Sequence, residues 1–237
     1  MLFWLGKYVL LGPWLRLLFR PIVEGAEHIP VGGAAIVASN HLSFCDSVFL
    51  PLMTRRRIVF LAKAEYFNRP GIAGWAKRVF FTGMGAVPID RSSGSAARSA
   101  LDTGARVLAE GALLGIYPEG TRSPDGKLYR GKTGVARLAL QARVPVVPVA
   151  MLNTHRVQPL GSKIPRIMRV RIRFGAPLDF SEHYACAGDR HVERAVTDRI
   201  MARLGELSGQ EYADVYASKV KSAMRDDAAT QGTTASA

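Results

Sequence analysis

Two residues of this sequence, His41 and Asp46, have types and spacing suited to acid–base chemistry. His41 follows the apolar run 34–38, which its small and β-branched residues predict to be a buried strand. Ser43 predicts the N-cap of a helix over 44–53, so the pair lies in a strand-to-helix turn, where α/β folds place their chemistry. In the first helical turn the carboxylate faces back toward the loop, where it can accept a hydrogen bond from one imidazole N–H. The other nitrogen is then free to act as a base.

No protein nucleophile accompanies this pair. The sequence holds no Gly-x-Ser-x-Gly motif, and neither Cys45 nor Cys186 lies in a nucleophile motif or at metal-site spacing. A base of this kind suits a reaction in which the substrate supplies the nucleophile, such as an alcohol that attacks an activated acyl group, for example a thioester. The alternative interpretation is an ordinary loop histidine bonded to a nearby carboxylate.

Composition indicates one domain and an anionic partner. The chain has 237 residues, is 48% hydrophobic and carries a formal net charge of +13. Such a charge is typical of proteins that meet a phospholipid surface, a phosphorylated substrate, a thioester carrier or nucleic acid. No nucleic-acid-binding motif occurs, so we expect no nucleic acid among the partners.

Residues 1–20 are predicted to associate with a membrane. They are almost wholly apolar, but Lys7, Pro13 and Arg16 interrupt them, whereas a spanning helix needs about 20 apolar residues with few charges. A buried core helix is the alternative. Aromatic and cationic side chains here suit the boundary between acyl chains and anionic head groups: Trp4, Lys7, Tyr8, Trp14, Arg16 and Arg20.

Two further predicted strands end in a cation. The run 58–62 ends at Lys63, on the same edge as His41 if the strands are parallel. A short strand over 84–89 ends at Asp90 and Arg91, and an arginine at such a place can donate two hydrogen bonds to phosphate oxygens. An ordinary solvated lysine and a local Asp90–Arg91 pair are the alternatives.

The strand predicted over 113–118 delivers a second polar loop. Gly120 permits a tight turn, and Arg122 offers a fork of donors to phosphate. Glu119 is expected to stay ionised and to fix the loop by accepting backbone or arginine donors. Lys132 begins the next predicted helix, where the helix dipole favours anions. Hydroxyl groups come from Thr121 and Ser123.

Together these segments resemble the glycerolipid acyltransferase family, most closely its bacterial 1-acyl-sn-glycerol-3-phosphate acyltransferases. Four blocks carry the resemblance in order: Asn40-His41 with Asp46, Gly85 to Arg91, Tyr117 to Ser123, and Val144 to Val149. Val23-Glu24-Gly25 before them and Phe174 to Pro177 after them are also similar to the family. Tyr117 stands where the family often has phenylalanine.

The resemblance implies an activity and a site. His41 would deprotonate the acceptor hydroxyl and Asp46 would orient it, with no metal or bound cofactor. A fatty acyl group would pass from acyl-coenzyme A or acyl-carrier protein to 1-acyl-sn-glycerol 3-phosphate (lysophosphatidic acid), giving phosphatidic acid. Glycerol 3-phosphate or another lysolipid is the alternative acceptor, and a non-catalytic nucleic-acid-binding protein is a distant alternative. Implied substrate-binding residues are Asn40, Lys63, Arg91, Glu119, Gly120, Thr121, Arg122 and Lys132.

The residue pattern and the resemblance together predict the architecture. We expect an α/β fold with a mostly parallel central sheet flanked by helices and an N-terminal membrane-interfacial helix. Residues 21–220 would form the acyltransferase domain, and 221–237 a disordered tail. In the strand predicted over 144–150, the prolines indicate a sheet edge or an irregular end. The protein would lie at the cytoplasmic face of the cell membrane, as a peripheral or monotopic protein.

Overall fold

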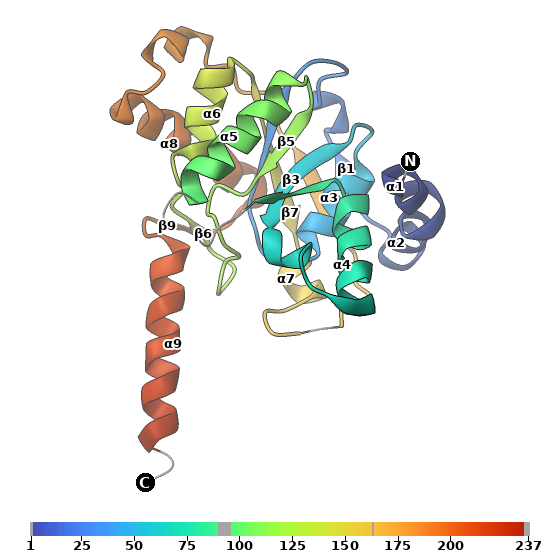
Figure 1. Cartoon of the computed structure of the whole chain (residues 1–237). Coiled ribbons are helices and arrows are strands. Elements are labelled where there is room, and N and C mark those ends of the chain that lie inside the picture. Colours follow the sequence, from blue (N-terminus) through green and yellow to red (C-terminus); the bar gives the residue numbers. More distant parts are fainter. Residues whose placement is uncertain (1, 90–95, 163, 235–237) are drawn as a thin grey trace.

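A twisted seven-stranded sheet forms the centre of the molecule (Figure 1). The computed structural model describes residues 2–89, 96–162 and 164–234. Neighbouring strands run parallel, except that β8 is antiparallel to β7. The spatial order is β1 (Ile22–Glu24), β8 (Arg171–Phe174), β7 (Val146–Leu152), β2 (Ala35–Ser39), β5 (Leu113–Ile116), β3 (Ile58–Lys63) and β4 (Ala86–Ile89). A mostly parallel sheet was expected, and it is confirmed.

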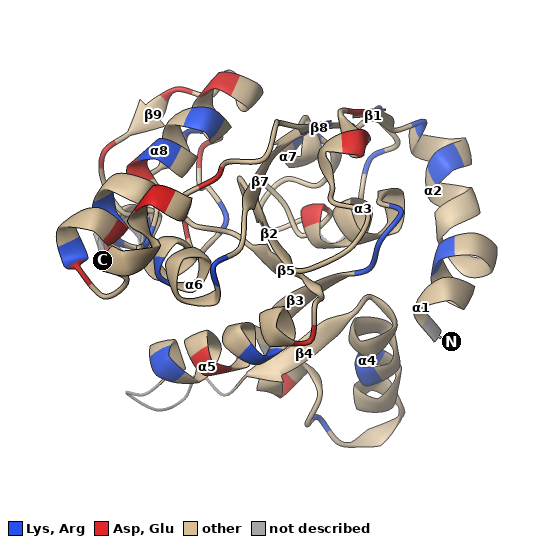
Figure 2. Ribbon diagram, turned by 90° about the horizontal axis from the view of Figure 1, so that it is seen from above, with Lys and Arg blue, Asp and Glu red and all other residues tan. Residues whose placement is uncertain are grey.

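Helices cover both faces of the sheet (Figure 2). One face carries α5 (Ala96–Ala109), α6 (Gly134–Ala142) and α8 (Arg190–Ser208); the other carries α2 (Gly12–Phe19), α3 (Asp46–Met53) and α4 (Gly71–Gly83). Ile36 and Ala38 of β2 pack toward the first group, while Ala35 and Val37 pack toward the second. Burial on both faces explains why β2 reads as one continuous apolar run.

The remaining elements are short, except for the last helix. They are α1 (Leu2–Leu5), a π-helical turn (Gly6–Leu10), α7 (Thr154–Val157), three 3₁₀ turns (Ala26–His28, Ala64–Tyr66 and Ser181–Cys186), a two-stranded sheet of β6 (Leu128–Tyr129) and β9 (Tyr212–Ala213), and α9 (Ala217–Thr234). Figure 1 shows α9 leaving the body of the molecule from a start beside β6 and β9. Where a disordered tail was expected from residue 221, the structure therefore has a helix as far as residue 234.

Helix α3 begins two residues later than the predicted cap at Ser43 implied. Asp46 is its first residue, and its carboxylate turns back to accept the backbone N–H groups of Leu42 and Ser43. The Ser43 hydroxyl accepts the N–H of Cys45 at 3.3 Å and donates to the carbonyl of Gln158. Because Asp46 satisfies the donors of the preceding turn, residues 42–45 stay outside the helix.

Of the two alternatives predicted from the prolines of residues 144–150, a sheet edge or an irregular end, the sheet edge is wrong. β7 lies inside the sheet, between β8 and β2. Pro148 lies just beyond the β7–β8 ladder, which ends at the pair Val149 and Phe174, and its carbonyl accepts the N–H of Gly175. The missing N–H of proline therefore removes no bond of that ladder, which is why an interior strand tolerates it.

The N-terminal segment is half embedded in the protein. Phe3 and Phe19 are buried, and Lys7, predicted to meet lipid head groups, is buried as well. The Lys7 ammonium donates to the carbonyl of Thr54 and lies within 5.8 Å of three aromatic ring centroids. Large apolar side chains are exposed on the outward side: Trp4, Leu5, Tyr8, Val9, Leu10, Trp14, Leu17 and Leu18. Arg16 and Arg20 are exposed as well. Of the helices described, none combines the length and apolar character needed to span a membrane.

A test of the core concerns Gly115 of β5. A Cβ atom there would lie 2.4 Å from the Phe60 ring, whereas in α8 a Cβ at Gly205 would meet Leu128 at an ordinary 3.7 Å. We expect Gly115→Ala to destabilise the protein by about 1–3 kcal/mol through overpacking. Gly205→Ala is the control and should stabilise it by about 0.5–1 kcal/mol, because alanine favours helix. Urea denaturation measures both, and equal free energies of unfolding for Gly115→Ala and wild type would contradict the packing described.

Candidate active site

His41 and Asp46 form a hydrogen-bonded pair at the carboxyl-terminal edge of the sheet. His41 Nδ1 lies 2.9 Å from Asp46 Oδ2. The same carboxylate oxygen accepts the N–H groups of Leu42 at 2.7 Å and Ser43 at 2.8 Å, and Asp46 is fully buried. An acceptor with three donors fixes the tautomer: Nδ1 carries the hydrogen, and Nε2 has the free lone pair.

The segment that follows the neighbouring strand β5 contacts the backbone and the ring of His41. The N–H of His41 donates to Glu119 Oε1 at 3.0 Å, and its carbonyl accepts the N–H of Ser123 at 2.7 Å. The imidazole stacks on Tyr117, with ring centroids 3.8 Å apart and planes within 11°. Tyr117 is in turn bonded to the hydroxyl of Ser47 at 3.0 Å. Backbone, ring face and Nδ1 are therefore all constrained, which leaves Nε2 for a substrate.

Glu119 differs from the sequence prediction in one respect. Its two oxygens accept the N–H groups of His41 and Tyr129, each at 3.0 Å, so it fixes the loop as expected. However, burial raises the pKa of Glu119 to about 7, although both backbone donors act in the opposite direction. The carboxyl is almost fully buried, so nearby cations do not hold its pKa at the ordinary value.

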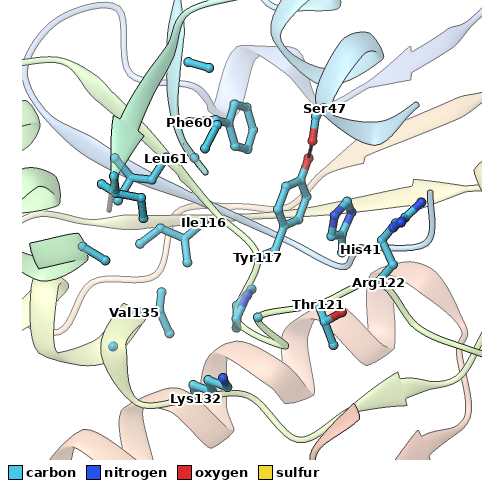
Figure 3. A pocket seen from close by; sticks show the side chains of 18 of the residues that line it. His41, Ser47, Phe60, Leu61, Ile116, Tyr117, Thr121, Arg122, Lys132 and Val135 are labelled. Carbon is cyan, nitrogen blue, oxygen red and sulfur yellow. Dashed lines mark hydrogen bonds between the residues drawn. The ribbon is translucent and has the colours of Figure 1, made fainter. Parts of the chain in front are cut away.

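A cavity of about 850 Å³ opens beside His41. Figure 3 shows His41, Tyr117 and Thr121 around it, with Arg122 and Lys132 nearby. One part is lined by apolar side chains: Phe44, Val48, Phe60, Leu61, Phe80, Phe81, Met84, Ile89, Leu101, Ile116 and Leu138. Another part is lined by cations: Arg122, Lys132, Arg137, Lys221 and Arg225. The cavity thus joins an apolar compartment, a base and a cationic compartment.

Three residues of the predicted Glu-Gly-Thr-Arg loop line this cavity, and so does Lys132. Gly120 has φ of +72°, a left-handed conformation that favours glycine, and its N–H donates to the Tyr117 carbonyl. This tight turn, which the sequence predicted, places Thr121 and Arg122 next to Lys132. Lys132 lies immediately before the cap of α6, as expected for a cation near a helix N-terminus.

Two of the other predicted binding residues, Asn40 and Glu119, do not line the cavity. Asn40 is fully buried and bonds the N–H and carbonyl of Met151 and the side chain of Gln210, so it ties β2 to β7 rather than lining the cavity. Glu119 likewise faces backbone donors. Lys63 ends β3 on the predicted edge, opposite Ile89 in the sheet register. Arg91 lies outside the described residues.

Sequence reasoning missed several residues of the site. Tyr117 stacks on His41. Its position as an aromatic residue at the end of a strand, next to the Glu119 loop, was a signal that could have identified it. Lys221 and Arg225 lie about 100 residues from the loop they approach, in a stretch that composition alone assigned to a tail. No local pattern relates them to Thr121.

The buried carboxyl of Glu119 predicts a pH-dependent stability. It keeps its proton up to about pH 7 when folded but loses it near its ordinary pKa of 4.5 when unfolded. Because the folded state binds more protons between these values, the free energy of unfolding falls as pH rises, by about 3 kcal/mol in all. Glu119→Gln lacks this titration. Urea denaturation at pH 5 and pH 8 should show the wild type losing stability relative to the variant, and parallel pH profiles would contradict the pKa.

Comparisons with known proteins agree with this geometry. The chain is 34% identical over 142 residues to the chloroplastic 1-acyl-sn-glycerol-3-phosphate acyltransferase LPAT1 of Arabidopsis thaliana, covering 60% of this chain and 38% of that protein. It is 33% identical over 135 residues to the human 1-acyl-sn-glycerol-3-phosphate acyltransferase alpha, covering 56% and 45%. The chain therefore spans less than half the length of each of these relatives.

A solved structure is also similar. The crystal structure of the 1-acyl-sn-glycerophosphate (LPA) acyltransferase PlsC from Thermotoga maritima superposes with a TM-score of 0.59 at 29% identity, covering 79% of this chain and 71% of that one. The family model named Acyltransferase matches residues 20–152. That range holds more than half of the 237 residues, including the His41–Asp46 pair and the loop from Tyr117 to Arg122, and the chain therefore belongs to the Acyltransferase family.

Proposed function

We propose that this protein transfers a fatty acyl group from an acyl thioester to the free hydroxyl of 1-acyl-sn-glycerol 3-phosphate, giving phosphatidic acid. The observation that carries the proposal is the position of His41, which lines a cavity that is apolar in one part and cationic in another. An acyl chain suits the apolar part and a phosphate the cationic part. The printed names of the similar proteins support the same reaction.

In the proposed mechanism His41 is the general base. Its Nε2 takes the proton of the acceptor hydroxyl as the oxygen attacks the thioester carbonyl carbon. The tetrahedral species then expels the sulfur, the C–S bond breaks, and the imidazolium returns the proton to the thiolate. Asp46 stabilises the imidazolium through Nδ1–H, since the two atoms are 2.9 Å apart. All atoms and protons are accounted for by substrates and His41, so the step needs no metal or bound cofactor.

Cations hold the acceptor in this proposal. Arg122 can give two parallel hydrogen bonds to a phosphate, and Lys132 adds a point charge near the start of α6. Lys63 and Arg91 remain predicted members of the same site. The acyl-coenzyme A or acyl-carrier-protein donor would place its chain among the aromatic side chains around Phe80 and Phe81. Both substrates then meet beside His41.

The lipid nature of these substrates favours a position at a membrane. We propose that the outward side of the N-terminal segment, residues 2–19, rests on an anionic bilayer at the cytoplasmic face of the cell membrane. Trp14 and Leu17 of α2 are each more than 60% exposed, which is unusual for large apolar side chains on neighbouring turns. A peripheral protein held in this way can draw its lipid acceptor from the membrane surface.

The proposed base is tested with His41→Ala. Loss of the base should lower the transfer rate by about 10²–10⁴-fold, measured by mass spectrometry of phosphatidic acid formed from lysophosphatidic acid and acyl-coenzyme A. Glycerol 3-phosphate and other lysolipids are offered in parallel to identify the acceptor. His155→Ala is a matched control, because His155 is an exposed histidine close to the site that does not line the cavity. A folded His41→Ala protein with more than a tenth of wild-type activity would refute the base assignment.

Membrane binding is tested with the double change Trp14→Glu and Leu17→Glu. Removing two apolar side chains and adding charge should reduce the fraction bound to anionic phospholipid vesicles roughly tenfold or more. Val31→Glu is the control, since Val31 is a fully exposed apolar residue in the loop before β2 and belongs to neither α1 nor α2. Co-sedimentation measures all three proteins, and equal binding of the double variant and the control would exclude this surface as the membrane contact.

A further inference from the structure

The chain after α8 is attached to the loop that carries Thr121 and Arg122. Gln210 donates to the carbonyl of Gly126 at 2.6 Å, and Glu211 accepts the N–H of Leu128 at 2.9 Å. β9 then pairs in parallel with β6, directly after that loop. This C-terminal attachment is therefore made to the segment next to the cationic compartment.

Further contacts fix the start of α9. The side chain of Arg130 lies over the Tyr216 ring at 5.7 Å and 3.6 Å from the carboxylate of Asp214. Ala217, the first residue of α9, is fully buried. Gln210 is also bonded to Asn40, next to the catalytic histidine, at 2.6 Å. The first turns of α9 consequently have a defined position relative to the site.

From this position α9 presents two cations to the cavity. Lys221 Nζ donates to Thr121 Oγ1 at 2.8 Å. Arg225 follows four residues later, on the same face of the helix, and both side chains line the cavity with Thr121 and Arg122. Ser218, Ser222 and Asp226 lie around an adjoining pocket that shares Thr121, Lys221 and Arg225.

The charges here are arranged as an anion site. Burial, and then the charges of Arg122 and Arg225, lower the pKa of Lys221. Glu119 raises that pKa, but its effect is the smallest of the four. Like charges held close together repel one another, and this repulsion costs free energy. A bound dianion would offset the repulsion. The ammonium of Lys221 meanwhile donates to a neutral hydroxyl, Thr121, a weaker partner than a phosphate oxygen.

The distance between each phosphate and the reacting atoms favours the phosphate of the acceptor over those of coenzyme A. In the acceptor, only two carbons and one oxygen separate the reacting hydroxyl oxygen from phosphorus, so the phosphate must bind close to His41. The loop of Thr121 and Arg122 meets that condition, because Ser123 in it donates to the His41 carbonyl at 2.7 Å. The phosphates of coenzyme A, in contrast, are many bonds away from the thioester.

We propose that Lys221 and Arg225 of α9 complete the binding site for the phosphate group of the lipid acceptor, together with Thr121, Arg122 and Lys132. This inference rests on the proposed function. It makes the C-terminal helix a part of the substrate site, with residues that determine the preference for a phosphorylated acceptor. On binding, the Lys221 ammonium would pass from the Thr121 hydroxyl to a phosphate oxygen.

The test compares Lys221→Ala with Lys219→Ala in the full chain. Lys219 is an exposed lysine on the same helix that does not line the cavity, so it controls for net charge and helix content. In mixed micelles of fixed detergent, Lys221→Ala should raise the KM for lysophosphatidic acid about tenfold or more, with kcat and the KM for acyl-coenzyme A nearly unchanged. Lys221→Arg should restore most of the loss, and Lys219→Ala should equal wild type.

Other outcomes overturn the proposal. A lysophosphatidic acid KM for Lys221→Ala equal to that of Lys219→Ala excludes the role, and a rise confined to the acyl-coenzyme A KM assigns the cations to the donor instead. Equilibrium binding of lysophosphatidic acid in the same micelles separates this result from failure of the proposed function. A wild-type protein that binds it through Lys221 but transfers no acyl group would disprove only the reaction.

Discussion

A single buried carboxylate oxygen organises the turn that carries His41. Oδ2 of Asp46 receives the imidazole of His41 and two backbone N–H groups, from Leu42 and Ser43. A fully buried carboxylate is costly unless donors satisfy it, so the chain between β2 and α3 has little freedom to adopt another path. The same bonds that close the turn also fix the tautomer of the His41 imidazole. The same hydrogen bonds therefore stabilise the fold of this segment and orient the imidazole.

A second buried carboxyl, Glu119, connects this turn to the neighbouring loop. It bridges the N–H of His41 and the N–H of Tyr129, two groups that are 88 positions apart in the chain. Because Glu119 precedes Gly120, Thr121 and Arg122, the bridge sets how far the cationic compartment lies from the imidazole. The raised pKa of Glu119 reflects the free energy needed to bury its charged form. Stability is given up at neutral pH to hold two parts of the site together.

Aromatic stacking completes the support of the His41 ring and borders the apolar compartment. Phe60, Tyr117 and His41 stack in sequence, with centroids 5.3 Å and then 3.8 Å apart. Gly115 allows Phe60 to reach this position, since a side chain there would collide with its ring. A glycine in the middle of a buried strand thus has a packing role that extends to the orientation of the imidazole.

Local patterns in the sequence were sufficient for much of this picture. The apolar runs predicted β2, β3 and β5 to within two residues at each end, and parallel strands place the segments that follow them on one edge. His41, Asp46 and the turn at Gly120 could be read from residue type and spacing, because each depends on neighbours within a few positions. Residue type and position also indicated Arg122 and Lys132 as candidates for binding an anion, and the resemblance to the family added the substrate that they would bind.

Only the tertiary structure decided the roles that depend on distant partners. Asn40 bonds Met151 and Gln210, Lys7 bonds Thr54, and the last helix brings Lys221 to Thr121. Whether a polar side chain faces a cavity or a backbone group depends on residues a hundred positions away. The position of β7 inside the sheet also depends on distant residues, because the order of the strands is set by packing on both faces of the sheet. Short-range preference determined the elements, and the long-range satisfaction of buried polar groups determined which side chains are left for a substrate.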